Sequence, residues 1–127
     1  MSDSVDLWGT DFEADDILPP ITIMKEQAAL LGRKTKFVVV ADIETENVGK
    51  EIVHHFSLIA RALDNYKYFL FRLKHEIDIY PVTVYWPPRS YEAKDEEEFT
   101  KLLGEILSSE NTTKIIRSML AQSKAAG

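Results

Sequence analysis

The chain of 127 residues contains no cysteine. It therefore cannot form a disulfide, supply a thiolate nucleophile or bind a metal through cysteine. It also lacks a run of about 18 apolar residues, the length that a membrane-spanning helix needs. Its first residues hold no basic stretch followed by an apolar core, so they do not match a secretory signal. We therefore expect a cytoplasmic protein that does not bind a membrane.

Sequence motifs for cofactors and for catalysis are missing as well. The five glycines are too dispersed to form a phosphate-binding loop, and neither GxGxxG nor a Walker-type pattern occurs. The metalloprotease pattern HExxH, the hydrolase pattern GxSxG and the EF-hand pattern do not occur either. We therefore expect no cofactor and no metal site, and we favour a non-catalytic role.

Negative charge is concentrated at one end of the chain. The net charge is −6, and residues 1–20 carry all of the excess because they contain six carboxylates and no lysine or arginine. The remaining residues hold equal numbers of acidic and basic side chains. A balanced body without a basic stripe offers little to a phosphate backbone, so nucleic-acid binding is not expected.

Composition divides the chain into two expected regions, an acidic flexible N-terminal tail at 1–16 and a single α+β domain at 17–127. Like charges repel one another in the tail, and few apolar groups compensate. Those groups are Val5, Leu7, Trp8 and Phe12. An acidic segment with aromatic residues can dock on a partner or fold back on its own domain. A flexible terminus with an incidental tryptophan is the simpler alternative.

A helix is expected after Pro19 and Pro20, because proline suits the first helical turn. Apolar residues recur on one face of it at helical spacing, namely Ile17, Ile21, Met24, Ala28 and Leu31. Gly32 stands where a residue of left-handed conformation would end this helix.

The period changes to two in the middle of the chain, as in a strand. Four strands are expected at residues 35–46, 51–63, 66–75 and 78–86. Short polar turns join them, which predicts an antiparallel meander. Pro81 lacks a backbone donor, so the fourth strand is expected at an edge of the sheet. The segment PPRSYEAK that follows is expected to end the sheet.

Two helices are expected after the sheet. Asp95 and Glu98 have the spacing of a capping box for the first of them. The segment SSEN, residues 108–111, separates it from a last helix at about 112–123. The predicted order is α-β-β-β-β-α-α, an α+β fold in which a four-stranded antiparallel meander packs with three helices.

The doublet of His54 and His55 raises the question of a metal or acid/base site. Successive residues of a strand point to opposite faces, so the two rings cannot bind one ion or share one proton. His75 ends the third strand, and a meander could bring it near one of the pair, with an acidic residue completing a site. A structural or partner-contact role is favoured over catalysis, because a lone histidine among apolar neighbours is usually hydrogen-bonded in the core.

The segment YWPPRSY, residues 85–91, is a candidate recognition edge. Tyr85, Trp86 and Tyr91 surround two prolines and Arg89, and aromatic and arginine side chains dominate interface energetics. A rigid connector whose rings pack on the rim of the sheet is the alternative, and we favour it. Together with His54 and His55, these four residues are the candidate binding residues.

Both faces of the middle strands are largely apolar, so each side of the sheet is expected to need cover. If the helices leave one face open, the tail, a second copy of the chain or a small apolar ligand could cover it. Helices divided over both faces are the alternative.

Three functions remain. We favour a non-catalytic protein-interaction or oligomerisation module, acting as a homodimer or as an adaptor for a protein partner. The second is a small-ligand-binding domain with a pocket between sheet and helices, lined by Phe56, Phe69, Phe71 and His54. The third and least favoured is an enzyme that uses a histidine with a carboxylate.

Overall fold

Alternating side chains in the middle of the chain produce one antiparallel sheet, and segments with helical spacing on either side of it produce three helices. A computed structural model describes residues 4–127. The helices are α1 (Pro20–Lys34), α2 (Glu96–Leu107) and α3 (Glu110–Ala126). The strands are β1 (Val39–Val48), β2 (Glu51–Ala60), β3 (Tyr66–His75), β4 (Val82–Trp86) and β5 (Arg89–Ala93), and a short 3-10 turn, η1 (Arg61–Leu63), follows β2. The predicted α+β class, with an antiparallel sheet and three helices, is confirmed.

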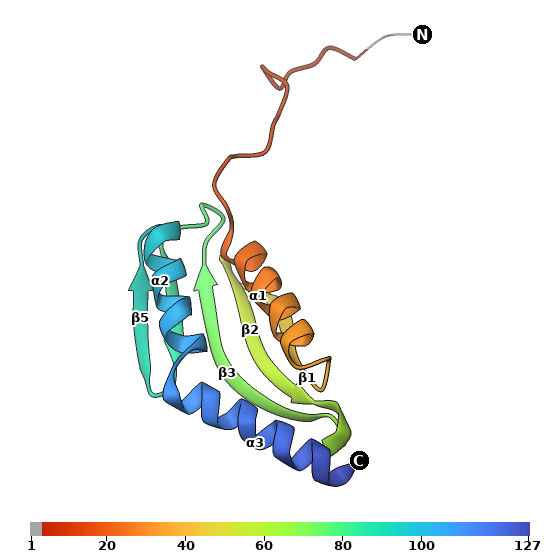
Figure 1. The fold of residues 1–127 in the computed structure, drawn as a ribbon. Coiled ribbons are helices and arrows are strands. Elements are labelled where there is room, and N and C mark those ends of the chain that lie inside the picture. The colour runs from red at the N-terminus through yellow and green to blue at the C-terminus, as the bar shows by residue number, and fades with distance from the viewer. Residues whose placement is uncertain (1–3) are drawn as a thin grey trace.

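The strands follow one another across the sheet in chain order, and each pair of neighbours is antiparallel (Figure 1). One irregularity lies between β2 and β3. Phe56 pairs with Phe71 but Ser57 pairs with Phe69, so Leu70 is an additional residue in β3. Such a bulge bends the strand and increases its twist. It also allows Leu70 and Phe71, which are consecutive, both to be buried.

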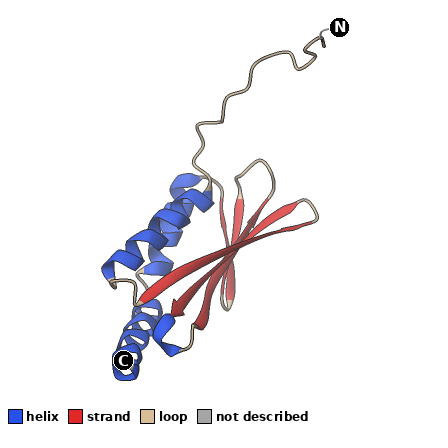
Figure 2. Ribbon diagram, turned by 90° about the vertical axis from the view of Figure 1, so that its right-hand side faces the viewer, coloured by secondary structure: helices blue, strands red, loops and turns tan. Residues whose placement is uncertain are grey.

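All three helices lie on the same face of the sheet (Figure 2). α1 packs on β1, α2 packs on β5, and α3 packs on η1 and on parts of β1 and β2. Large side chains with almost no exposed surface fill the space between the two layers, among them Met24, Phe56, Phe71, Leu73, Phe99 and Ile106. The rings of Phe56 and Phe71 stack with their centroids 5.0 Å apart. The core is therefore one layer between the helices and the sheet.

The opposite face of the sheet has no helix over it within residues 4–127, and charged side chains cross it instead. Lys67 on β3 pairs with Asp42, at 3.4 Å, and with Glu44, both on β1. The Arg72 guanidinium lies 4.6 Å from the centre of the Tyr85 ring. The alternative in which the helices divide over both faces is therefore wrong. On the open face, long charged side chains can cover apolar surface with their stems while their heads stay in water.

The prediction of four strands is wrong, because the segment after Trp86 continues the sheet. Pro87 and Pro88 form a tight turn, and β5 then pairs with β4 along its whole length. The sequence RSYEA alternates as a strand should, with Tyr91 half-buried and Ala93 buried. β4 begins after Pro81 and has neighbours on both sides, so it is not the edge strand that was predicted.

Gly32 does not end the first helix, as was predicted, but lies within its last turn. A Cβ atom at this position would lie 3.0 Å from Cε1 of Phe37, so glycine allows this ring to approach the helix closely. Thr35 caps the helix, and its hydroxyl lies 2.8 Å from the carbonyl oxygen of Val39. β1 therefore begins at Val39 rather than at residue 35.

The last two helices begin at side-chain caps. The Asp95 carboxylate accepts a hydrogen bond of 2.9 Å from the Glu98 N–H, as the capping-box spacing predicts. Glu98 in turn accepts from the Lys94 N–H at 3.0 Å rather than from Asp95. α3 begins before residue 112, because the Ser109 hydroxyl accepts from the Thr112 N–H at 3.1 Å and already caps it.

The stacked phenylalanine pair makes a direct test of the core. We expect Phe71→Ala to reduce the free energy of unfolding by about 3–5 kcal/mol, because it removes a fully buried ring and leaves a cavity. Urea denaturation followed by circular dichroism measures the change. Ile77→Ala is the control, since that side chain is 81% exposed and should change stability by less than about 0.5 kcal/mol. Equal effects of the two substitutions would contradict the described core.

Candidate functional site

The structure separates the two adjacent histidines. His54 faces the helices and is buried, and its Nδ1 atom lies 2.8 Å from the Thr45 hydroxyl. His55 lies on the open face, where its Nε2 atom is 3.1 Å from a carboxylate oxygen of Glu46. The two rings therefore belong to different surroundings and cannot form one site.

His54 instead has His75 as its neighbour, with ring centroids 5.5 Å apart. The Nδ1 atom of His75 lies 2.6 Å from the Glu76 carbonyl oxygen, so this nitrogen carries a proton and donates it. No group of three His, Cys, Asp or Glu side chains within residues 4–127 is arranged to hold a metal ion. Burial, together with the nearby His75 and Lys25, lowers the pKa of His54 from 6.5 to about 4. This histidine is therefore uncharged at neutral pH.

The aromatic segment at residues 85–91 spans two faces of the sheet. Trp86 and Tyr91 lie on the helix side near its rim, with ring centroids 6.2 Å apart. Tyr85 points to the open face, where Arg72 covers its ring. Arg89 begins β5 and is exposed. The candidate residues of this segment are therefore divided between the two faces, and they do not surround a common cavity.

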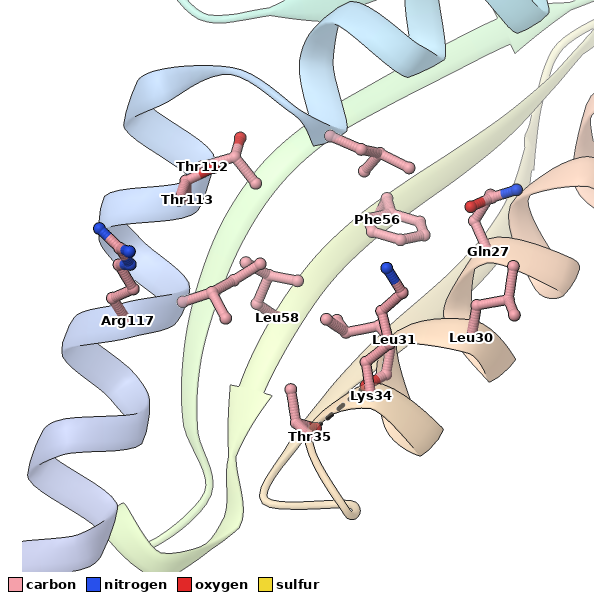
Figure 3. A pocket seen from close by; sticks show the side chains of 12 residues that line it. Gln27, Leu30, Leu31, Lys34, Thr35, Phe56, Leu58, Thr112, Thr113 and Arg117 are labelled. Atoms are coloured by element: carbon pink, nitrogen blue, oxygen red, sulfur yellow. Dashed lines mark hydrogen bonds between the residues drawn. The ribbon is translucent and has the colours of Figure 1, made fainter.

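A cavity of about 410 Å³ lies elsewhere, where α1 and α3 diverge over the centre of the sheet (Figure 3). Its floor is formed by Phe56 and Leu58 of β2. The walls are apolar side chains of the three helices, Leu30 and Leu31 of α1, Leu107 of α2 and Ile116 of α3. Polar side chains complete the lining, namely Gln27, Lys34, Thr35, Thr112, Thr113 and Arg117. We call this cavity the α1–α3 groove.

Among residues 4–127, the charged residues that line the α1–α3 groove are all cationic. They are Lys34, at the end of α1, and Arg117, near the middle of α3. In Figure 3 the Lys34 side chain extends from the helix end toward Phe56. Neither cation forms a salt bridge with a carboxylate of residues 4–127. A negatively charged group in the groove would therefore meet two positive charges without a competing carboxylate in the lining.

Two of the threonine hydroxyls that line the groove form hydrogen bonds within the fold. Thr112 is buried, and its hydroxyl donates to the Ile106 carbonyl oxygen at 2.8 Å. The Thr35 hydroxyl accepts from the Val39 N–H at 3.2 Å. The lining contains no histidine, serine or carboxylate that could activate a nucleophile.

A second cavity continues the groove along α1. It has a volume of about 340 Å³, lies between α1 and α2, and is lined in part by Ile23, Thr100 and Leu103. Gln27 and Leu107 line both cavities, so the two adjoin. Their lining residues follow α1 from its first turn, at Ile23, to its last turn, at Lys34.

Sequence reasoning found one residue of this groove. Of the four residues expected to line a pocket, Phe56 does so, whereas Phe71 lies in the core, Phe69 lies on the open face and His54 lies outside the lining. Lys34 and Arg117 were missed, because whether both line one cavity depends on how far two helices diverge. An alternation pattern carries no signal of that divergence.

The chain has no significant match to a protein-family model, to a curated protein or to a solved structure. Within residues 4–127, no helix combines the length and the apolar character needed to cross a membrane. The residues of the groove are therefore the basis for assigning a function.

Buried His54 makes stability depend on pH. Its pKa in the folded state, about 4, lies below the value of 6.5 expected when the chain unfolds, so acid favours the unfolded state. We expect the stability that uncharged His54 contributes to be intact above about pH 6.5 and lost as the pH falls to about 4. The free energy of unfolding should decrease by at most about 3 kcal/mol over this range. Urea denaturation across this pH range measures it.

The matched variants are His54→Gln, which should remove this pH-dependent loss, and His55→Gln on the open face, which should retain it. A loss of the same size in the His54→Gln variant would contradict the assignment of the effect to this ring.

Proposed function

We propose that this protein is a non-catalytic interaction module, and that its α1–α3 groove receives an acidic peptide segment with large apolar side chains. The observation that carries the proposal is the composition of the groove, an apolar floor and walls with two cations and no carboxylate.

The shape of the groove supports a peptide as its occupant. The two adjoining cavities extend along α1 and are open to solvent on the outer side of the helices. A peptide can place one apolar side chain in each cavity while its backbone remains in water. Apolar anchors in pockets supply most of the binding energy of such contacts.

The charges support the same partner. Lys34 and Arg117 are exposed at their outer ends, so pairs with carboxylates there contribute modestly, about 0.2–1 kcal/mol each. Their main effect is on selectivity, because a basic peptide would place like charges together. An acidic segment is accepted and a basic one is rejected.

Peptide selection against the full-length protein tests this function. Random dodecapeptides displayed on phage should yield binders in which carboxylates flank tryptophan, phenylalanine or leucine. The double variant Lys34→Glu with Arg117→Glu should bind the selected peptides about tenfold more weakly, as fluorescence anisotropy with synthetic peptides will show.

The control for that experiment is Lys101→Glu with Lys124→Glu, which changes the net charge by the same amount at exposed residues outside the α1–α3 groove. It should leave affinity unchanged. Selection of basic peptides, or equal binding by both double variants, would contradict the proposal.

A small amphipathic carboxylate is the second candidate for the same groove. A volume of about 410 Å³ falls within the range of small-molecule pockets, about 300–1,000 Å³. Straight-chain carboxylates from octanoate to tetradecanoate would then raise the melting temperature, because a ligand that binds only the folded state stabilises it. The matching alcohols are the control. Melting temperatures that stay constant with every carboxylate would remove this candidate.

A further inference from the structure

The N-terminal residues of this chain have the composition that the α1–α3 groove is suited to receive. Residues 4–16 contain five carboxylates and no basic side chain. Their large apolar side chains are exposed, Leu7 by 88%, Trp8 by 75% and Phe12 by 72%. The Trp8 and Phe12 rings are 5.9 Å apart, edge to face, and so form a single apolar unit. The segment thus combines negative charge with aromatic groups, which complement the two cations and the apolar lining of the groove.

The connection to α1 holds this segment away from its own domain. The Tyr80 hydroxyl donates to the Leu18 carbonyl oxygen at 3.1 Å, and Leu18 packs against the core. Pro19 is extended, with φ −65° and ψ 149°, and Pro20 is the first residue of α1. Both views show residues 5–16 running away from the helices and the sheet (Figures 1 and 2). The chain therefore leaves the domain in a direction fixed by an anchored residue and two prolines.

This exit direction favours a groove on another molecule. The segment of 13 residues spans about 40 Å when extended, whereas α1 is about 22 Å long. To enter its own groove, the segment would first have to reverse direction beside Pro19 and then return along α1. No such reversal is needed to reach a second copy that faces the first.

We propose that residues 4–16 of one copy bind in the α1–α3 groove of a second copy, and that the exchange is reciprocal about a two-fold axis. The inference rests on the proposed function, since it names the acidic peptide that the groove receives. Trp8 and Phe12 occupy the apolar part of the groove, and the neighbouring carboxylates Asp6 and Asp11 lie toward Lys34 and Arg117.

Because the exchange is reciprocal, the pair of copies contains two equivalent contacts, and both contribute to the buried area. An aromatic side chain buries about 150–250 Å², so two rings in each of two grooves bury about 600–1,000 Å² on the tail side alone. Counting the groove surface they cover, the pair reaches the size of a stable interface, about 1,200–2,000 Å² in total. Its ionic part is screened by salt, so association should weaken at high ionic strength.

Paramagnetic relaxation between two populations of the full-length chain tests this proposal. The chain has no cysteine, so Ser4→Cys accepts a nitroxide at one position only. The nitroxide-labelled protein, at natural isotopic abundance, is mixed with methyl-labelled protein of the native sequence at millimolar total concentration. The Leu30, Leu31 and Ile116 methyl signals should lose more than half of their intensity, and ascorbate reduction of the nitroxide should restore it.

Two further samples control the experiment. A nitroxide at Ser90→Cys, exposed on β5, should leave the same methyl signals intact. Trp8→Ala with Phe12→Ala in the Ser4→Cys protein should abolish the loss of intensity, and sedimentation should then give a monomer where the native chain gives a dimer.

Two outcomes overturn the proposal. One is full methyl intensity in the mixed sample together with a loss in a second sample, in which each molecule carries both the nitroxide and the methyl label. That result would place the segment in its own groove. The other is full methyl intensity in the mixed sample and also in the sample that carries both labels in one molecule. That result would leave the groove to a different acidic segment. In the second case the selected peptides would still bind, so failure of this inference and failure of the proposed function are distinguishable.

Discussion

The packing of Phe56 against Phe71 is the contact on which the rest of the structure depends. The two rings stack across β2 and β3 where Leu70 is inserted as a bulge. The bulge bends the sheet under the helices, so α1 follows β1 while α3 follows η1 and the adjoining ends of β1 and β2. The helices consequently diverge over Phe56, which belongs to the core and also forms the floor of the groove. The site is therefore a product of how the core is packed.

The apolar side chains on the two faces of the sheet have different surroundings. One face buries its side chains under three helices, and the other is crossed by charged side chains such as Lys67 and Arg72. Ion pairs on that face are individually weak because water screens them. Val53 and Ser57 are nevertheless buried on this face without a helix above them. The α1–α3 groove on the helix side is thus a surface cavity with an apolar floor and walls.

The spacing of neighbouring residues predicted those helices and strands that a short stretch of sequence determines. The alternation from Tyr66 to His75 marks β3 at its observed ends, and the pair of Asp95 and Glu98 marks the start of α2. β5 was missed because Pro87 and Pro88 were taken to end the sheet, although they form a turn inside it. The groove was missed, apart from Phe56, because Lys34 and Arg117 lie far apart in the chain and line one cavity only through helix packing. Tertiary packing, rather than residue spacing, made this site.

We predict that an aromatic anion binds where α1 and α3 diverge. The most direct measurement is a methyl NMR titration of the native chain with 8-anilinonaphthalene-1-sulfonate, which joins aromatic rings to one negative charge. Saturable shifts confined to Leu30, Leu31, Leu58 and Ile116, residues that line the groove, are the predicted result. Shifts centred on Val53 and Ile59 of the open face, or no saturable shift, would contradict the account.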